Sequence, residues 1–139
     1  MTPKSTQVFQ VSSELNLLSD KVIDAAIEVH KLLGPGYLKS VYEEALCVEL
    51  TLRGIRFERQ KRISLKYKGV EVGTSRLDLL IEGKLIVELK AIELVLPVHQ
   101  AQVISYLKAT GCELGLLLNF NVKLLKEGIV RVARSQHIS

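Results

Sequence analysis

Apolar residues recur at two different spacings along this chain, and the changes of spacing predict its elements. Helical spacing runs from Lys21 to Leu33. Ser19 or Asp20 can cap this helix, and the Gly-Pro-Gly run at 34–36 ends it. Its buried face would be formed by Val22, Ala26, Val29 and Leu33.

The same spacing predicts two more helices. The second runs from Lys39 to Arg53, and Gly54 can take the left-handed conformation that follows a helix end. The third starts at Pro97, which suits a first helical turn, and ends at Gly111. The buried face of the second helix would consist of Val41, Ala45, Val48 and Leu52.

Strand patterns fill the rest of the chain. Residues 55–72 alternate around Tyr67-Lys68-Gly69 and predict a hairpin. Residues 77–90 form two apolar segments around Glu82-Gly83-Lys84 and predict a second hairpin, buried on both faces. Further strands are expected at 114–120 and 129–132. This order, without an internal repeat, predicts one α/β (α+β) domain.

The ends of the chain lack such patterns. We expect residues 1–19 to be a flexible N-terminal arm, 20–134 a single domain and 135–139 a tail. Hydrophobic residues make up 47% of the 139, enough for a packed core. No apolar stretch reaches the ~18 residues that span a bilayer, and the first residues lack a secretory pattern. We therefore expect a cytoplasmic protein that has no membrane partner.

Two other features of the composition bound the function. Cys47 and Cys112 lie in apolar contexts without metal-ligand spacing, so we expect reduced, partly buried thiols and exclude a Cys-rich zinc site. The net charge is +4, but residues 53–68 hold seven basic residues against one acidic residue, a net of +6. That segment could guide a nucleic-acid backbone, or protect an edge strand from edge-to-edge pairing.

The second hairpin carries three charges among apolar residues, and these need partners because an unpaired buried charge is costly. If Glu82-Gly83-Lys84 is a three-residue loop, Asp78 falls opposite Glu88, with Cβ atoms about 5 Å apart. Lys90 then shares that face. A two-residue loop would destroy this arrangement.

Two facing carboxylates repel each other unless a positive charge lies nearby. Mg²⁺ or Mn²⁺ suits such oxygen ligands, and Lys90 could then hold a water or stabilise negative charge. The alternative is a cross-strand ion pair of Asp78 with Lys90 or Arg76, without a metal. In the third helix, His99, Gln102 and Tyr106 lie within an arc of about 60°. They could approach the end of the sheet beside a core face of Val103, Ile104 and Leu107, or be ordinary boundary side chains.

Taken together, these segments resemble the GxxExxY family, which is placed in the PD-(D/E)xK nuclease-like superfamily. The resemblance covers about residues 20–134. It is carried by 33–36 (LGPG), 40–46 (SVYEEAL), 76–80 (RLDLL), 87–91 (VELKA), 99–102 (HQAQ), 106–111 (YLKATG) and 115–120 (GLLLNF).

The resemblance implies a restriction-endonuclease-like core, in which a central mixed β-sheet carries the D…ExK motif on a hairpin between flanking helices. Asp78 is then similar to the motif aspartate, and Glu88 and Lys90 to the ExK pair. Gln102 and Tyr106 match a Q-x3-Y element, and the helical acid of the superfamily would be Glu43 or Glu44.

One position departs from the family motif. The name-giving segment runs from Gly36 to Tyr42, and Lys39 stands where the family usually has Glu. Lys39 and Glu43 lie four residues apart on one helical face, so Glu43 could pair with Lys39 or replace the missing acid.

We expect a divalent-metal-dependent, nuclease-like protein that acts on or binds the phosphodiester backbone of nucleic acid. The expected catalytic residues are Asp78, Glu88, Lys90 and Gln102; the metal ligands Asp78, Glu88 and Glu43 or Glu44; and the substrate contacts Arg59, Lys61, Arg62, Arg76, His99 and Tyr106. A nuclease-fold module without turnover and a structural or oligomerisation domain are the alternatives. A homodimer is compatible with the length, but no sequence signature requires one.

Overall fold

The computed structural model describes residues 6–8 and 11–137 of the chain. The helices are α1 (Ser13–Leu33), α2 (Lys39–Leu52) and α3 (Pro97–Thr110), with a short 3-10 helix η1 (Leu125–Gly128). The strands are β1 (Thr6–Val8), β2 (Phe57–Tyr67), β3 (Val70–Ile81), β4 (Leu85–Lys90), β5 (Leu114–Asn119), β6 (Ile129–Ala133) and β7 (Ser135–His137).

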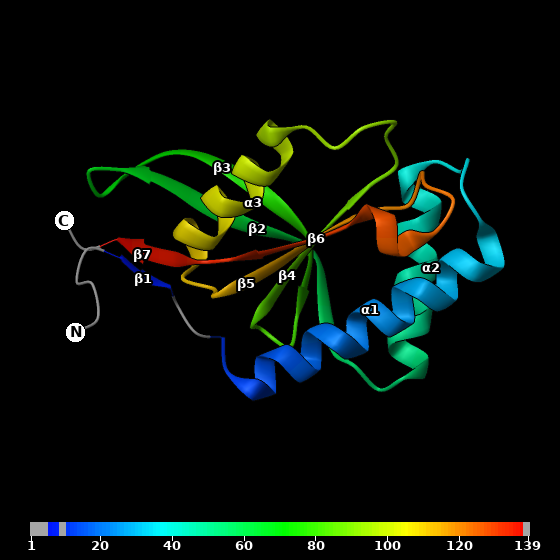
Figure 1. Cartoon of the computed structure of the whole chain (residues 1–139). Coiled ribbons are helices and arrows are strands. Elements are labelled where there is room, and N and C mark those ends of the chain that lie inside the picture. The colour runs from blue at the N-terminus through cyan, green and yellow to red at the C-terminus, as the bar shows by residue number, and fades with distance from the viewer. Residues whose placement is uncertain (1–5, 9–10, 138–139) are drawn as a thin grey trace.

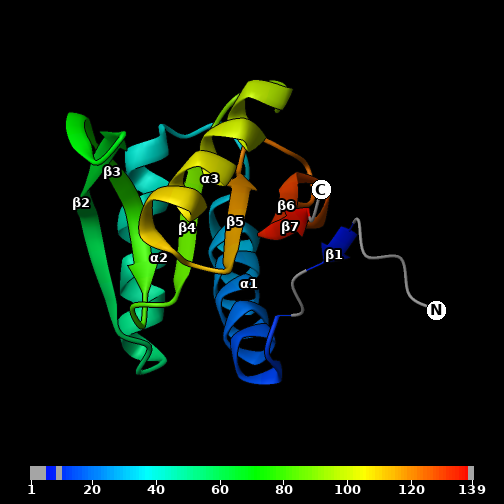
Figure 2. The same ribbon diagram turned by 90° about the vertical axis from the view of Figure 1, so that its left-hand side faces the viewer.

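A mixed five-stranded sheet forms the centre, in the order β2-β3-β4-β5-β6. Only β4 and β5 run parallel within it, and α3 connects them. Helix α3 covers one face of the sheet, and α1 and α2 cover the other (Figures 1 and 2). Strands β1 and β7 pair separately as a two-stranded antiparallel sheet. The predicted α/β class with a mixed central sheet is confirmed.

Helix α1 begins earlier than predicted. It starts at Ser13 rather than Lys21, and the Ser12 hydroxyl caps it by accepting a hydrogen bond from the Leu15 N–H at 3.2 Å. Leu15 is only 5% exposed, so residues 13–19 belong to the packed helix and not to the arm. This stretch is rich in polar residues, so the sequence pattern did not indicate its buried helical face. That face, with Leu15 and Ser19, continues the spacing of Val22. Residues 6–8 of the predicted arm and 135–137 of the predicted tail form the paired strands β1 and β7, whereas 1–5, 9–10 and 138–139 lie outside the described residues.

Helix α2 has the predicted bounds within one residue, but its buried face was predicted wrongly. Val41, Val48 and Leu52 are exposed. The buried face consists instead of Tyr42, Glu43, Leu46, Cys47 and Leu50. This set has helical spacing too, but it contains a glutamate, which a search for apolar residues alone rejects.

Tyr42 fixes the first turn of α2 against the rest of the domain. Its ring is fully buried and stacks on Phe120, with 4.7 Å between ring centroids. Its hydroxyl donates to the Gly34 carbonyl at 2.6 Å and accepts from the Tyr37 N–H at 3.1 Å. The loop between α1 and α2 is thereby tied to the helix that follows it. Residue 39, three positions before Tyr42, is held in a defined place.

Both predicted hairpins are present, and β3 belongs to both. Lys68 and Gly69 have positive φ in the turn between β2 and β3. The loop at 82–84 has Gly83 at φ 68°, and Ile81 pairs with Leu85 as predicted for a three-residue loop. The predicted register is therefore confirmed as far as the Leu79–Val87 pair, and beyond it hydrogen bonds between backbone N–H groups and carboxylates join Asp78 to β4.

The cysteines and the helices bear on two further predictions. Cys47 and Cys112 are both free thiols, Cys47 buried and Cys112 half-buried. Burial raises the pKa of the Cys47 thiol to about 11, so it stays protonated at neutral pH.

In the described part of the chain, none of the helices combines the length and the apolar character that crossing a bilayer requires.

Candidate active site

Asp78 and Glu88 lie next to each other just beyond the end of the β3–β4 ladder. The ladder pairs residues from Ile81–Leu85 to Leu79–Val87. Beyond it, hydrogen bonds to the two carboxylates join the strands. The Asp78 N–H donates to Glu88 Oε2 at 2.7 Å, and the Leu89 N–H donates to Asp78 Oδ2 at 2.9 Å. Each carboxylate is therefore oriented by the backbone of the other strand. Both residues are only 5% exposed.

The environment of Glu88 disfavours its charge. Burial, and next the negative charge of Asp78, raise the pKa of Glu88 to about 7. The Asp78 N–H and the positive charges of Lys39 and Lys90 act in the opposite direction without cancelling this effect. The positive charges of Lys39 and Lys90 therefore do not fully offset the effect of burial and of Asp78 on Glu88.

This pKa predicts how stability depends on pH in the metal-free protein. The folded state holds the Glu88 proton more tightly than the unfolded chain, whose glutamate pKa is about 4.5. The free energy of unfolding should therefore fall between about pH 4.5 and pH 7, by up to about 3 kcal/mol from this group. Urea unfolding in EDTA at several pH values, with Glu88→Gln as the comparison, measures it. A wild-type minus variant difference that stays constant over this range would contradict the assignment.

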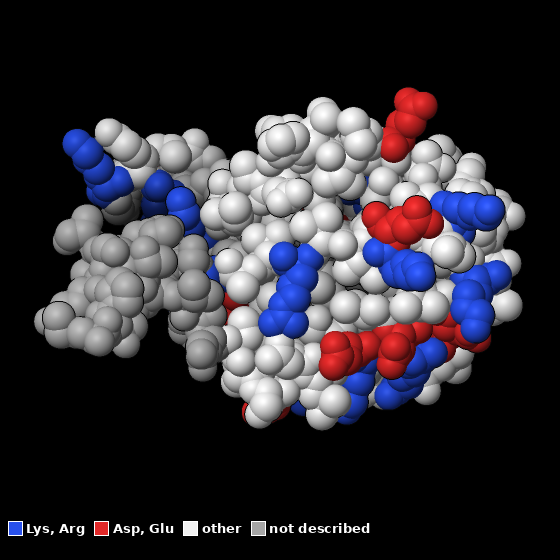
Figure 3. Space-filling view, viewed as in Figure 1, with Lys and Arg blue, Asp and Glu red and all other residues white. Residues whose placement is uncertain are grey.

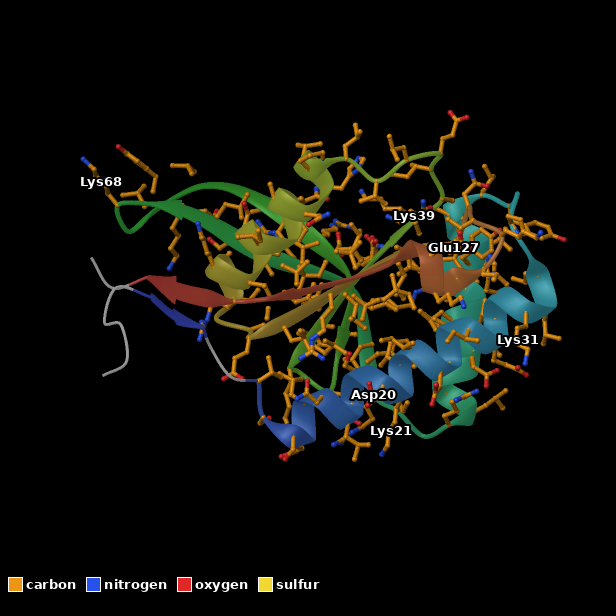
Figure 4. All side chains as sticks on the ribbon, in the orientation of Figure 1. Asp20, Lys21, Lys31, Lys39, Lys68 and Glu127 are labelled. Carbon is orange, nitrogen blue, oxygen red and sulfur yellow. The ribbon has the colours of Figure 1, made fainter. Side chains whose placement is uncertain are left out.

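Lys39 is the cation nearest to this pair in the described residues. Its Nζ lies 2.9 Å from Asp78 Oδ1. The side chain of Lys39 is 43% exposed, whereas that of Asp78 is 7% exposed. Figure 4 shows Lys39 at the beginning of α2. The sequence suggested Lys90 or Arg76 as the ion-pair partner of Asp78, and Glu43 as a partner of Lys39. The ion pair in the structure joins Lys39 to Asp78 instead.

Of the two candidate helical acids, Glu43 faces the site. Glu43 is buried, and it accepts hydrogen bonds from Arg59 at 2.9 Å and from the Gln60 amide at 3.1 Å. The Glu44 side chain is 67% exposed and pairs only with Arg59, at 3.0 Å, among the described residues. Arg59 thus ties α2 to β2.

Gln60 is the site residue that sequence reasoning missed. Its amide nitrogen lies 3.1 Å from Glu43 Oε1 and 3.4 Å from Asp78 Oδ1, so it links the helical acid to the strand acid. Its φ of 50° is unusual for a residue other than glycine. The β2–β3 register passes from Arg59–Leu79 to Lys61–Leu77 around it. A glutamine inside a basic strand gives no sequence signal of this role.

The alternation of β3 changes at the same place. Leu77 packs in the core beneath α3, whereas Leu79, two residues later, packs in the core beneath α1 and α2. In a regular strand these two side chains would lie on one face. The change occurs at Asp78, beside the positive φ of Gln60, and such irregularities re-aim side chains at functional sites.

The α3 residues are arranged differently from the prediction. The hydroxyl of Tyr106 lies 2.8 Å from Ser75 Oγ, and its ring belongs to the core beneath α3, where Ile104 was expected but is 43% exposed. His99 Nδ1 accepts from the Leu96 N–H at 2.9 Å and so caps its own helix. Gln102 is exposed. Within the described chain, no hydrogen bond or ion pair joins these side chains to Asp78 or Glu88.

A comparison with protein families decides the class of the protein. A profile of the PD-(D/E)XK nuclease superfamily matches residues 16–132. The chain belongs to the PD-(D/E)XK nuclease superfamily. Its mixed sheet between helices is consistent with the restriction-endonuclease-like fold. No significant match was found among curated proteins or among solved structures. The narrower likeness to the GxxExxY family stays a prediction.

Superfamily membership makes a divalent metal the group to test against these residues. In the described part of the chain, no group of three or more His, Cys, Asp or Glu side chains is placed to hold a metal ion. Mg²⁺, however, is commonly held by one or two carboxylates, with waters and substrate phosphates as its other ligands. Asp78 and Glu88 supply such a pair, and the Lys39 ammonium already stands beside it as a cation. The donor set therefore fits one hard divalent ion, while the Glu43 carboxylate is engaged by Arg59 and Gln60.

The basic residues of segment 53–68 do not all lie around Asp78 and Glu88. Strand β2 lies at the edge of the sheet. Lys61 pairs with Glu58 at 3.1 Å, and Arg62 and Arg76 are exposed at paired positions of β2 and β3. Lys68 lies at the far tip of the hairpin, well away from Lys39 (Figure 4). On the face seen in Figure 3, acidic and basic side chains are interspersed along α1. Both interpretations of the basic segment remain compatible with this arrangement.

Proposed function

We propose that this protein is a divalent-metal-dependent nuclease that cleaves the phosphodiester backbone of nucleic acid. The observation that carries the proposal is the carboxylate pair of Asp78 and Glu88, oriented by reciprocal backbone hydrogen bonds and short of positive charge. Membership of a nuclease superfamily supports the same chemistry.

Asp78 and Glu88 would hold Mg²⁺ or Mn²⁺. When bound, the ion would polarise a phosphoryl oxygen and lower the pKa of a water. The two backbone N–H groups keep the carboxylates in place before the ion arrives, so little ordering is needed on binding.

Lys90 is proposed to stabilise negative charge that develops on the phosphate. It is half-buried, two residues after Glu88 on β4, and close enough to lower the pKa of that carboxyl. Arg62 and Arg76, exposed and side by side on β2 and β3, are proposed to contact the backbone, together with Lys61. Gln102 and His99 are proposed as contacts from α3, and Tyr106 as a residue that positions β3 through Ser75.

The second candidate is a nuclease-fold module that binds nucleic acid without cleaving it. The ion pair between Lys39 and Asp78 favours this candidate, because the pair partly neutralises a proposed metal ligand. The two functions differ in turnover, which an assay on substrate can measure directly.

The test is a cleavage assay on end-labelled single-stranded and double-stranded DNA and RNA, with Mg²⁺, Mn²⁺ or EDTA. We expect cleavage of at least one substrate with metal, none with EDTA, and a loss of about 10²- to 10³-fold in Lys90→Met. Lys108→Met, an exposed lysine on α3, serves as the control variant. Salt-sensitive binding to any of these substrates without metal-dependent cleavage would favour the binding module instead.

A further inference from the structure

We propose that the Lys39 ammonium occupies the place of the divalent cation beside Asp78, so that a metal ion binds only by displacing it. This inference rests on the proposed function, since it concerns the same carboxylate pair. It assigns to Lys39 a role as a tethered competitor that sets the metal affinity of the site.

The first support is the direction in which Lys39 is presented. Tyr42, locked by its ring and hydroxyl, fixes the first turn of α2, and Lys39 is the first residue of that helix. From this fixed point its Nζ reaches across to β3 and lies 2.9 Å from Asp78 Oδ1. Glu43, four residues on, is occupied by Arg59 and Gln60. The local partner of Lys39 is therefore already taken.

The second support is the use of the two Asp78 oxygens. Oδ2 accepts from the Leu89 N–H, which leaves Oδ1 for a cation. Oδ1 is the oxygen that Lys39 contacts, with Gln60 beside it at 3.4 Å. An ammonium and a divalent ion on one oxygen would repel each other strongly at this separation. Binding of one therefore requires departure of the other.

The third support is that Lys39 can leave. Its side chain is 43% exposed, so its ammonium can return to water without opening the core. Asp78 cannot follow it, because the carboxylate is held by Leu89 and is almost fully buried. The exchange therefore needs movement of one flexible side chain only.

Calorimetric titration of Mn²⁺ into the full chain tests the proposal. The variants are Lys39→Met, which removes the charge and keeps most of the length, Lys39→Gln as a second neutral variant, and Lys39→Arg, which keeps the charge. Lys21→Met, an exposed lysine on α1 remote from the site, is the control (Figure 4). Circular dichroism establishes that each variant is folded.

Both neutral variants should bind Mn²⁺ about 5- to 150-fold more tightly than the wild type, the range typical of coupled sites. They should also show a larger rise in melting temperature with Mn²⁺. Lys39→Arg and Lys21→Met should bind like the wild type. Equal or weaker binding by folded neutral variants, when the wild type does bind, would overturn the role of Lys39 and leave the proposed function standing. No binding by the wild type or by either neutral variant would overturn both.

Discussion

Asp78→Asn should lower metal-dependent cleavage by about 10³-fold or more while the protein stays folded. The change removes the charge that attracts the metal ion, and a bound metal contributes several kcal/mol of transition-state stabilisation. The asparagine oxygen can still accept the Leu89 N–H bond that Asp78 Oδ2 accepts at 2.9 Å. The measurement is the initial rate of cleavage of a labelled oligonucleotide at saturating Mg²⁺.

Asp20→Asn provides the matched control for this variant, because Asp20 is an exposed acid on α1, away from the carboxylate pair (Figure 4). It should retain the wild-type rate. If Asp78→Asn keeps a rate within about tenfold of the wild type, Asp78 does not hold the metal that drives cleavage.

Tyr42→Ala should lower the free energy of unfolding by about 3–5 kcal/mol, the usual cost of emptying a buried aromatic site. The tyrosine ring is fully buried against Phe120, and its hydroxyl holds the Gly34 carbonyl. Tyr42→Phe keeps the ring and should cost only about 1–2 kcal/mol. Urea unfolding followed by circular dichroism measures both.

Tyr37→Ala is the matched control, because Tyr37 is 50% exposed, gives Tyr42 a hydrogen bond from its backbone N–H, and touches the Tyr42 ring only by an edge contact. It should cost less than about 1 kcal/mol. A Tyr42→Ala cost no larger than that of Tyr37→Ala would show that this contact does not fix the start of α2. The placement of Lys39 would then need another explanation.

The hairpin geometry could be predicted from the sequence because it is local. A glycine-containing loop of three residues fixes the pairing from Ile81–Leu85 to Leu79–Val87, and this pairing brings Asp78 next to Glu88. The third helix was also located well, since Pro97 and Gly111 mark its ends. Local chemistry determines each of these features, so one sequence suffices.

The packing of helices on the sheet could not be predicted in the same way. The buried face of α2 includes Glu43, which is tolerated there because Arg59 and Gln60 from β2 satisfy it. A search for apolar residues therefore chose the neighbouring face with Val41 and Val48. Only the assembled fold shows that a charged residue belongs inside.

The partner of Asp78 depended on the same long-range packing. The helical i,i+4 rule favoured Lys39 with Glu43, a pair usually worth less than about 1 kcal/mol. In the fold Glu43 has Arg59 and Gln60 as partners, and Lys39 extends to Asp78 instead. Gln60, which links Glu43 to Asp78, has a positive φ in the middle of β2. No pattern of residues in the sequence indicates this conformation.

The most direct test of the carboxylate pair as a metal site is calorimetric titration of Mn²⁺ into the wild type and Asp78→Ala at the same pH and ionic strength. We expect saturable binding to the wild type and none to the folded variant, because Asp78→Ala leaves Glu88 as a single buried carboxylate. Equal heats in the two proteins, or no binding to either the wild type or Lys39→Met at millimolar Mn²⁺, would contradict this assignment.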